Sequence, residues 1–175
     1  MVKKEFNLGS DFMNVNRKEY HLLLNYIRGM GKVLEEEWQK NAKTLGLTLA
    51  EQHVMWIVCS KDPISITEIA KVGLWDRSTV MQVVKRLQGK KLVRLLKDER
   101  DLRITYIELT EEGEEKRRES KHKDYKFFEF LNKYQKDNEK FMEELICFHR
   151  EVNLHFHGKE FIDWVEETTD KFDDW

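Results

Sequence analysis

The sequence has very little of what interrupts helices or cross-links chains. Its 175 residues include one proline, eight glycines and two cysteines. Because proline and glycine break helices, their scarcity beside 37% charged residues predicts a mostly helical protein with short connections. Cys59 and Cys147 stand far apart and form no CxxC pair, which is typical of reduced thiols in a cytoplasmic protein.

Long apolar runs and catalytic motifs are also missing. No stretch reaches the roughly 18 consecutive apolar residues of a membrane span. The N-terminal MVKKEFNLGSDF lacks the apolar segment of a secretory signal. The sequence contains no nucleophile–base signature, P-loop or GxGxxG motif. We therefore expect a cytoplasmic protein that is not an enzyme, spans no membrane and needs no cofactor.

The charge is unevenly distributed along the chain, although the net charge is only −2. Residues 77–103 carry nine lysines and arginines against three acids, whereas residues 124–175 carry 14 acids against seven bases. A basic segment within an acidic chain is typical of a localised surface that binds anions such as nucleic acids. An ordinary solvated face would also explain such a charge run, and composition alone does not separate the two.

The first half of the chain predicts an N-terminal arm followed by a long helix. Residues 1–15 are expected to form the arm, and an amphipathic helix is predicted from about Arg17 to Ala42. Its apolar residues recur with the i, i+3, i+4, i+7 spacing of one helix face, and Gly46 is expected to end it. These apolar residues are Tyr20, Leu23, Leu24, Ile27, Met30, Leu34 and Trp38.

Two capping boxes mark the starts of the next two helices. In Thr48-Leu-Ala-Glu51 the threonine side chain can accept from the backbone N–H three residues on while the glutamate reaches back, and Ser65-Ile-Thr-Glu68 repeats the pattern. Pro63 ends the first helix, because the residue before a proline is pushed out of the helical region. The second helix is only about eight residues long, and a positive φ at Gly73 is expected to turn the chain.

A third helix is predicted from Arg77 to about Gln88, with Asp76 as its N-cap and Gly89 as its stop. A short helix, a tight turn and a longer helix form a helix-turn-helix, here at about residues 65–89, whose second helix enters a major groove of DNA. The apolar residues expected to face inward are Val80, Val83, Val84 and Leu87. The polar residues expected to contact DNA are Arg77, Ser78, Thr79, Gln82, Lys85 and Arg86.

The period of the pattern then changes from 3.6 to 2, which predicts a β-hairpin wing at about residues 92–109. A wing can place an arginine in the narrow minor groove, where the negative potential is strongest. Asp101 and Arg103 are two residues apart, so an extended backbone would let the carboxylate orient the guanidinium. A solvated turn with incidental charges is the alternative. The candidate wing residues are Lys97, Arg100, Asp101 and Arg103.

These segments resemble the MarR-type winged-helix transcription regulators. SITEIAKVGLWDRSTVMQVVKRLQGKKLV and LVRLLKDERDLRITYIELTEEG are similar to that family's helix-turn-helix and wing. The similarity includes the Asp-x-Arg pair at Asp101 and Arg103 and the Leu-Thr-x-x-Gly exit at residues 109–113. The similarity runs over about residues 33–119. Within it, the segment EEEWQKNAKTLGLTLAEQHVMWIV resembles the Hpr subgroup of the family. The family's wing often has an arginine after the aspartate, whereas this chain has Leu102.

The resemblance implies a mainly helical fold with a small β-hairpin wing, in which N- and C-terminal helices join two chains. It implies a homodimeric repressor of pseudo-palindromic double-stranded DNA, with a small-molecule effector in some members. The Hpr subgroup further implies negative regulation of protease production and sporulation genes. With Leu102 in the wing, Arg100 becomes the second basic group at the tip. The family domain is expected over residues 16–160, followed by an acidic helical tail at residues 161–175.

The apolar residues of the sequence independently favour a second chain. A winged helix over about residues 48–113 is too small to cover both the long first helix and the many large apolar residues after residue 124. A second copy related by two-fold symmetry would cover them, and it would place two recognition helices about 34 Å apart, one turn of DNA.

Three histidines near the C-terminus raise the question of a metal site. His149, His155 and His157, with Glu151 nearby, lack the cysteines or the compact loop of a typical zinc site. On a helix, His155 and His157 would point in different directions. We therefore expect no metal, and solvated or hydrogen-bonded histidines instead.

One cysteine and three tryptophans also have two interpretations each. Cys59 could sense peroxide, but no cation adjoins it in sequence, which favours a buried and inert thiol. Trp38, Trp56 and Trp75 could line a small-molecule pocket, although aromatic residues at helical spacing are more often part of the core.

The sequence leaves two classes of function open. The favoured hypothesis is a sequence-specific DNA-binding regulator. The alternative is a protein-interaction module, an acidic helical dimer that docks another regulator and uses its wing only incidentally. A steep loss of DNA affinity with rising salt would distinguish the first from the second.

Overall fold

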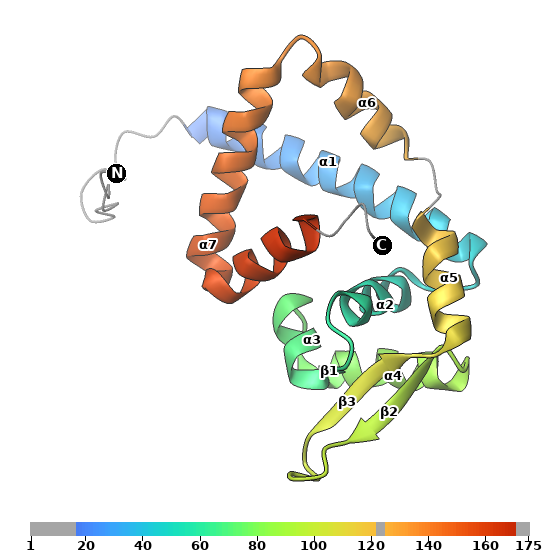
Figure 1. Cartoon of the computed structure of the whole chain (residues 1–175). Helices are drawn as coiled ribbons and strands as arrows, with labels where there is room; N and C mark the ends of the chain where they lie inside the picture. The colour runs from blue at the N-terminus through green and yellow to red at the C-terminus, as the bar shows by residue number, and fades with distance from the viewer. Residues whose placement is uncertain (1–16, 122–124, 171–175) are drawn as a thin grey trace. The chain divides into compact units, whose positions relative to one another are not determined.

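The computed structural model describes residues 17–121 and 125–170, so the predicted arm at residues 1–15 lies outside the described part. The predicted mainly helical fold with a β-hairpin wing is confirmed (Figure 1). The chain divides into two compact units, residues 1–36 and 37–175, and the boundary falls inside the first helix. The elements are α1 (Arg17–Thr44), α2 (Leu49–Ser60), β1 (Ile64–Ser65), α3 (Ile66–Val72), α4 (Arg77–Gly89), β2 (Val93–Lys97), β3 (Thr105–Leu109), α5 (Glu111–Lys121), α6 (Lys126–Gln135) and α7 (Glu139–Asp170).

The sheet has three antiparallel strands in the order β1-β3-β2. The two wing strands pair from Val93 opposite Leu109 to Lys97 opposite Thr105. The third strand, β1, places Ile64 opposite Ile107. The sequence did not predict β1, because a strand of two residues is too short to show an alternating pattern.

Both predicted capping boxes are confirmed. Thr48 Oγ1 accepts from the backbone N–H of Glu51 at 3.2 Å, and Glu51 Oε2 accepts from the backbone N–H of Thr48 at 2.8 Å. Ser65 Oγ accepts from the backbone N–H of Glu68 at 3.2 Å, and Glu68 Oε2 accepts from that of Ser65 at 3.0 Å. These bonds satisfy N–H groups at the helix starts that have no partner within the helix, and so they fix where α2 and α3 begin.

The positive φ that was expected at Gly73 lies one residue further on. Gly73 has a φ of −78°, and the positive φ lies at Leu74 (56°). A Cβ on Gly73 would come within 2.8 Å of the carbonyl oxygen of Ile69, so the glycine is required by close packing and not by its φ. Gly89, the predicted stop of the third helix, is the last residue of α4, and Lys91 two residues later has a positive φ (61°).

The hydrophobic core lies among α2, α3, α4 and the sheet. Its central side chains are almost completely shielded from water, and burying each contributes about 1.5–3 kcal/mol to folding. This core fixes α4 and the wing in one rigid arrangement. The core residues with at most 1% exposure include Val54, Met55, Ile57, Val58, Ile64, Ile69, Val80, Val83, Leu87 and Ile107.

The end of α7 packs on this core. The helix is broken at Gly158, whose φ of 80° and ψ of 179° are accessible mainly to glycine. Beyond the break, Ile162 is 4% exposed and Trp164 Nε1 donates to Ser60 Oγ at 2.9 Å. The expected tail at residues 161–175 is therefore, as far as residue 170, the last part of α7, and residues 171–175 lie outside the described residues.

The long helices also carry many large apolar side chains on their surfaces. None of the described helices combines the length and the apolar character needed to cross a membrane. Large exposed apolar side chains that gather on a surface are typical of a site where another surface binds. Those of the long helices include Tyr20, Leu23, Leu24 and Ile27 on α1, Phe128, Phe130 and Tyr134 on α6, and Phe141, Ile146, Phe148 and Phe156 on α7.

Candidate nucleic-acid interface

Helix α4 presents one apolar and one polar face, as predicted. Its buried residues are Val80, Val83, Val84 and Leu87. Of the six candidate DNA-contacting residues, Thr79 is half-buried and the other five are exposed: Arg77, Ser78, Gln82, Lys85 and Arg86. The polar face is thus available to a ligand along its whole length, while the apolar face fixes the orientation of the helix.

The predicted N-cap of α4, Asp76, is confirmed and has further partners. Its Oδ1 accepts from the backbone N–H of Thr79 at 2.8 Å, and its Oδ2 accepts from Thr79 Oγ1 at 2.7 Å. The hydroxyl of Ser78 also donates to Asp76, and these bonds hold the pKa of the aspartate well below its ordinary value. The hydroxyl protons of Ser78 and Thr79 are therefore engaged, and toward DNA both residues can serve only as acceptors or as apolar contacts.

The wing tip carries the ion pair that the sequence predicted. Arg103 Nε donates to Asp101 Oδ1 at 2.9 Å, and Arg103 Nη2 donates to Asp101 Oδ2 at 2.9 Å. The hydrogen bond from Arg103 lowers the pKa of Asp101, so the carboxylate stays charged. The arginine side chain is nevertheless 90% exposed. The guanidinium is held in one orientation while almost all of it remains accessible.

The backbone that creates this pair is a tight turn and not the extended segment that was expected. Ile104 N donates to the carbonyl of Asp101 at 2.9 Å, and the backbone N–H of Arg103 donates to Asp101 Oδ1 at 3.0 Å. A second aspartate supports the turn, since Asp98 Oδ1 accepts from the backbone N–H groups of Arg100 and Asp101, both at 2.8 Å. Side-chain bonds of this kind are the reason that aspartate is common in turns.

The other predicted wing residues lie beside this turn. Lys97 Nζ donates to Thr105 Oγ1 across the hairpin at 2.7 Å. Arg100 is exposed, and Leu102 is 72% exposed. Lys97, Arg100 and Arg103 are thus all at the surface of the wing, with an apolar side chain between the two tip arginines.

The Leu-Thr-x-x-Gly segment, residues 109–113, forms the base of the wing. Thr110 Oγ1 donates to the carbonyl of Lys91 at 2.7 Å and accepts from the backbone N–H of Gly113 at 3.1 Å. A Cβ on Gly113 would collide with the carbonyl oxygen of Leu92. The threonine and the glycine together let α5 begin directly against the backbone of the wing, which fixes where the wing emerges.

A buried carboxylate beneath α4 was missed as a possible functional group. Glu51 is 1% exposed, with Lys90 Nζ 2.8 Å from its Oε2 and Arg86 Nε 3.4 Å from its Oε1. Burial alone would raise the pKa of Glu51, but hydrogen bonds from Lys90 and Thr48 outweigh it and the pKa lies below its ordinary value. The capping box was a signal for Glu51, but its partners, Arg86 on α4 and Lys90 just after that helix, are 35 and 39 residues away in sequence.

The C-terminal histidines have aromatic and backbone partners. Nδ1 of His149 lies 2.8 Å from the carbonyl oxygen of Leu145. His155 and His157 each lie against a phenylalanine, with ring centroids 4.7 Å and 5.5 Å apart. Within residues 17–121 and 125–170, no group of three or more histidine, cysteine or acidic side chains is arranged to hold a metal ion.

Cys59 and the three tryptophans considered from the sequence have different surroundings. Cys59 is half-buried, and burial raises the pKa of its thiol, which makes it less reactive. Trp75 packs on the core and against His53, with ring centroids 5.1 Å apart. Trp56 Nε1 donates to Ser120 Oγ at 3.1 Å, and Trp38 is 38% exposed.

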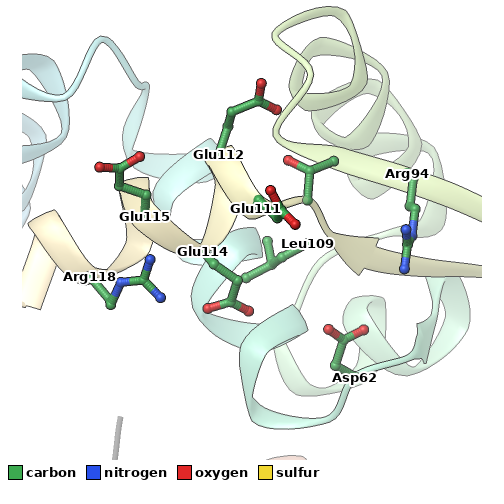
Figure 2. A pocket seen from close by; sticks show the side chains of 9 residues that line it. Asp62, Arg94, Leu109, Glu111, Glu112, Glu114, Glu115 and Arg118 are labelled. Atoms are coloured by element: carbon green, nitrogen blue, oxygen red, sulfur yellow. The ribbon is translucent and has the colours of Figure 1, made fainter.

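A surface hollow of about 970 Å³ lies where α5 leaves the wing. Figure 2 shows Glu114, Glu115 and Arg118 of α5 on one side of it, with Asp62 and Arg94 on the other. Burial, together with the carboxylates of Glu108 and Glu114, raises the pKa of Asp62. None of the described residues that line the hollow is a tryptophan, so it is not the aromatic pocket considered from the sequence.

Comparison with known proteins identifies the central part of the chain. Residues 47–105 match the model of the MarR family. HTH-type transcriptional regulator Hpr from Geobacillus thermodenitrificans is 41% identical over 88 residues, which are 50% of this chain and 44% of that protein. DNA-binding transcriptional repressor ScoC from Bacillus subtilis is 38% identical over 88 residues, 50% of this chain and 43% of that protein. The chain therefore spans less than half the length of these curated relatives.

Solved structures are similar over a larger part of the chain. The transcriptional regulator BldR from Sulfolobus solfataricus has a TM-score of 0.62 at 22% identity. The similarity covers 79% of this chain and 98% of the BldR chain. A MarR variant from E. coli, complexed with operator DNA, has a TM-score of 0.62 at 19% identity. The similarity covers 76% of this chain and 96% of the MarR chain. These likenesses establish the winged-helix fold. Residues 47–105 thus match the MarR family model, and their fold is a winged helix.

Proposed function

We propose that this protein is a sequence-specific, DNA-binding transcriptional regulator. In this proposal α4 enters the major groove, where Gln82 contacts base edges and Lys85 contacts phosphates, while the wing places Arg103 in the minor groove. Ser78 and Thr79, whose hydroxyl protons are bound by Asp76, accept hydrogen bonds from bases or pack against thymine methyl groups.

The observation that carries the proposal is the geometry of Arg103. Arg103 is 90% exposed yet held by two side-chain hydrogen bonds, and exposed ion pairs of this kind contribute little to the stability of the fold. The same arrangement is useful for binding, since a guanidinium that is already oriented loses less entropy when it docks. A wing arginine of this kind suits the narrow, electronegative minor groove of DNA.

We further propose that the protein acts as a homodimer. The exposed apolar side chains of α1, α6 and α7 support this proposal, because a monomer would leave them all in contact with water. Two-fold symmetry would present one α4 helix to each half of a pseudo-palindromic site, with half-sites about 34 Å apart. Such a protein would be located at the nucleoid in the cytoplasm.

The similarity to Hpr and ScoC suggests which genes are regulated. ScoC is a DNA-binding repressor, and we propose that this protein is likewise a repressor. Genes of extracellular protease production and sporulation are the expected targets, in line with the Hpr resemblance. A small-molecule effector that relieves binding is compatible with this role.

Selection of bound fragments from random duplex DNA, followed by a salt titration, tests the proposal. We expect an enriched pseudo-palindrome whose binding weakens steeply with salt, with a slope of log K against log [salt] of about −0.9 per phosphate contacted. A protein-interaction module would enrich no sequence and would show only a shallow dependence. That result would contradict the proposal.

A further inference from the structure

Two cations near the end of α4 converge on one buried carboxylate. Arg86 Nε lies 3.4 Å from Glu51 Oε1, and Lys90 Nζ lies 2.8 Å from Glu51 Oε2. The Glu51 side chain is 1% exposed, whereas those of Arg86 and Lys90 are 48% and 40% exposed. The anion is therefore inside the protein, the two cations extend from it to the surface, and the group as a whole is positive.

The carboxylate is fixed by more than these two cations. Glu51 Oε2 also accepts from the backbone N–H of Thr48 at 2.8 Å, so the start of α2 determines its position. Lys90 Nζ additionally donates to the carbonyl of Gly46 at 2.8 Å, which joins the end of α4 to the loop before α2. A side chain that pairs with Glu51 consequently has its direction set by the protein core and not by solvent.

We propose that Glu51 is a positioning residue for DNA binding. It holds the guanidinium of Arg86 through the ion pair at Nε, while nearly half of the arginine side chain stays open to a phosphate of the DNA backbone. Arginine binds phosphate through a planar fork, and an oriented fork loses less side-chain entropy when it docks. This inference rests on the proposed DNA-binding function, and it assigns Arg86 to phosphate contact and not to base recognition.

Glu51 thus has the same relation to Arg86 that Asp101 has to Arg103. In both pairs a carboxylate orients an exposed guanidinium. At the wing the carboxylate is at the surface, whereas under α4 it is inside the protein and also caps a helix. Sequence similarity to a capping box would suggest only a structural role for Glu51, and the ion pair with Arg86 is what adds the functional one.

A double-mutant cycle on Glu51 and Arg86 tests the inference. Glu51→Gln removes the charge but can keep the capping box, because glutamine also serves at that position. Binding of a duplex obtained by selection is measured by fluorescence anisotropy at fixed salt, and thermal unfolding is measured in parallel. We expect Arg86→Ala to weaken binding roughly tenfold and Glu51→Gln roughly fivefold, the size expected for a lost charge-assisted contact. The double variant should lose less than the product of these factors.

Glu68→Gln is the matched control. Glu68 is also the acid of a capping box with a lysine partner, but its bonds are to Ser65 and Lys61 and not to α4. Its substitution should lower the melting temperature and leave DNA affinity unchanged. If Glu51→Gln behaves in the same way, and Arg86→Ala has the same effect in both backgrounds, Glu51 has only a structural role and the inference is overturned.

A second variant keeps the test decisive if Glu51→Gln does not fold. Arg86→Lys alters only a surface residue and retains the positive charge. Lysine, however, lacks the Nε–H group through which Glu51 orients the planar guanidinium of Arg86. We expect it to weaken binding several-fold, and binding equal to that of the wild type would overturn the inference. A wild-type protein that selects no duplex would instead overturn the proposed function, and the inference with it.

Discussion

The winged-helix region and the terminal helices differ in what surrounds their apolar side chains. Between α2 and β3 most of the large apolar residues form a core that is almost completely shielded from water. Helix α6 has no buried residue, and the only buried residue of α1 is Ala42. The comparison indicates that the winged helix is stabilised by its own core, whereas the helices at the two ends leave many of their large apolar side chains exposed.

Their polar groups differ in a corresponding way. In the winged helix the aspartates and glutamates are bonded to helix starts, turns and cations, as Asp76, Asp101 and Glu51 are. On α7 the ion pairs join exposed side chains, as in Arg150 with Glu166 and Lys159 with Asp163. Exposed pairs contribute little to stability. The polar groups of the winged helix therefore fix local geometry, whereas those of α7 mainly keep its surface soluble.

Deletion of Tyr125–Trp175 should have the largest effect, because it removes α6 and α7 together. We expect monomeric or aggregated protein with exposed apolar surface on α1. Sedimentation velocity measures the outcome. A soluble and well-folded dimer from the truncated chain would show that α6 and α7 take no part in association.

A point substitution separates association from folding, because the deletion also removes Trp164 from Ser60. Phe148 is 55% exposed on α7, and Phe148→Asp should weaken self-association by about 2 kcal/mol or more if the ring lies in the interface. The control Phe148→Leu retains an apolar contact and should lose much less. Equal sedimentation of both variants and the wild type at micromolar concentration would exclude this face from the interface.

The next largest effect should come from the core under α4. Leu87 is completely buried, and Leu87→Ala is expected to lower the free energy of unfolding by about 2–5 kcal/mol, because the change leaves a cavity. Leu95→Ala on the wing is the matched control, since Leu95 is 40% exposed and should lose no more than about 0.5 kcal/mol. Urea denaturation of both variants measures the difference. Similar losses would mean that the core is not centred under α4.

The two kinds of contact proposed for α4 can be separated. Gln82→Ala should relax the preference at one or two base pairs per half-site, at about 1–3 kcal/mol for each lost bidentate contact. Lys85→Ala should weaken all sequences nearly equally and reduce the salt slope by about one. Binding-site selection with each variant is the measurement. An unchanged preference in Gln82→Ala would remove Gln82 from base recognition.

The smallest effect concerns where the two regions meet. Trp164→Phe keeps an aromatic side chain but removes the donor to Ser60, and loss of this hydrogen bond should lower the free energy of unfolding by about 0.5–1.5 kcal/mol, in addition to the loss of packing from the smaller ring. Ser60→Ala alone and combined with Trp164→Phe completes the cycle, measured by thermal unfolding. Additive losses would mean that this hydrogen bond does not join α7 to the winged helix.

The features that the sequence predicted correctly depend on neighbours in the chain. The capping boxes at Thr48 and Ser65, the N-cap at Asp76 and the pairing of Asp101 with Arg103 all join residues two or three apart. Local hydrogen bonds of this kind follow from residue type and spacing alone. The two faces of α4 were predictable for the same reason, since their 3.6-residue period is a property of the helix itself.

The features that the sequence did not reveal depend on residues far apart in the chain. Glu51 meets Lys90 and Arg86 only after α2 and α4 have packed together. The positive φ at Leu74, beside the glycine that was expected to take it, depends on how tightly the next element returns to the core. The Ile57 side chain on α2, 3.1 Å from where a Cβ on Gly73 would lie, is a tertiary contact of the same kind.

A double-mutant cycle at the wing tip tests the central claim, which is that α4 and the wing form a preorganised DNA-binding surface. Asp101→Ala, Arg103→Ala and the double variant are compared with the wild type by fluorescence anisotropy at fixed salt on one selected duplex. Preorganisation predicts that Asp101→Ala weakens binding, by roughly tenfold at most, because a free arginine must lose side-chain entropy on docking. The double variant should lose less than the two single changes combined. Tighter binding by Asp101→Ala, as simple charge repulsion from phosphate would give, or strictly additive losses would contradict the claim.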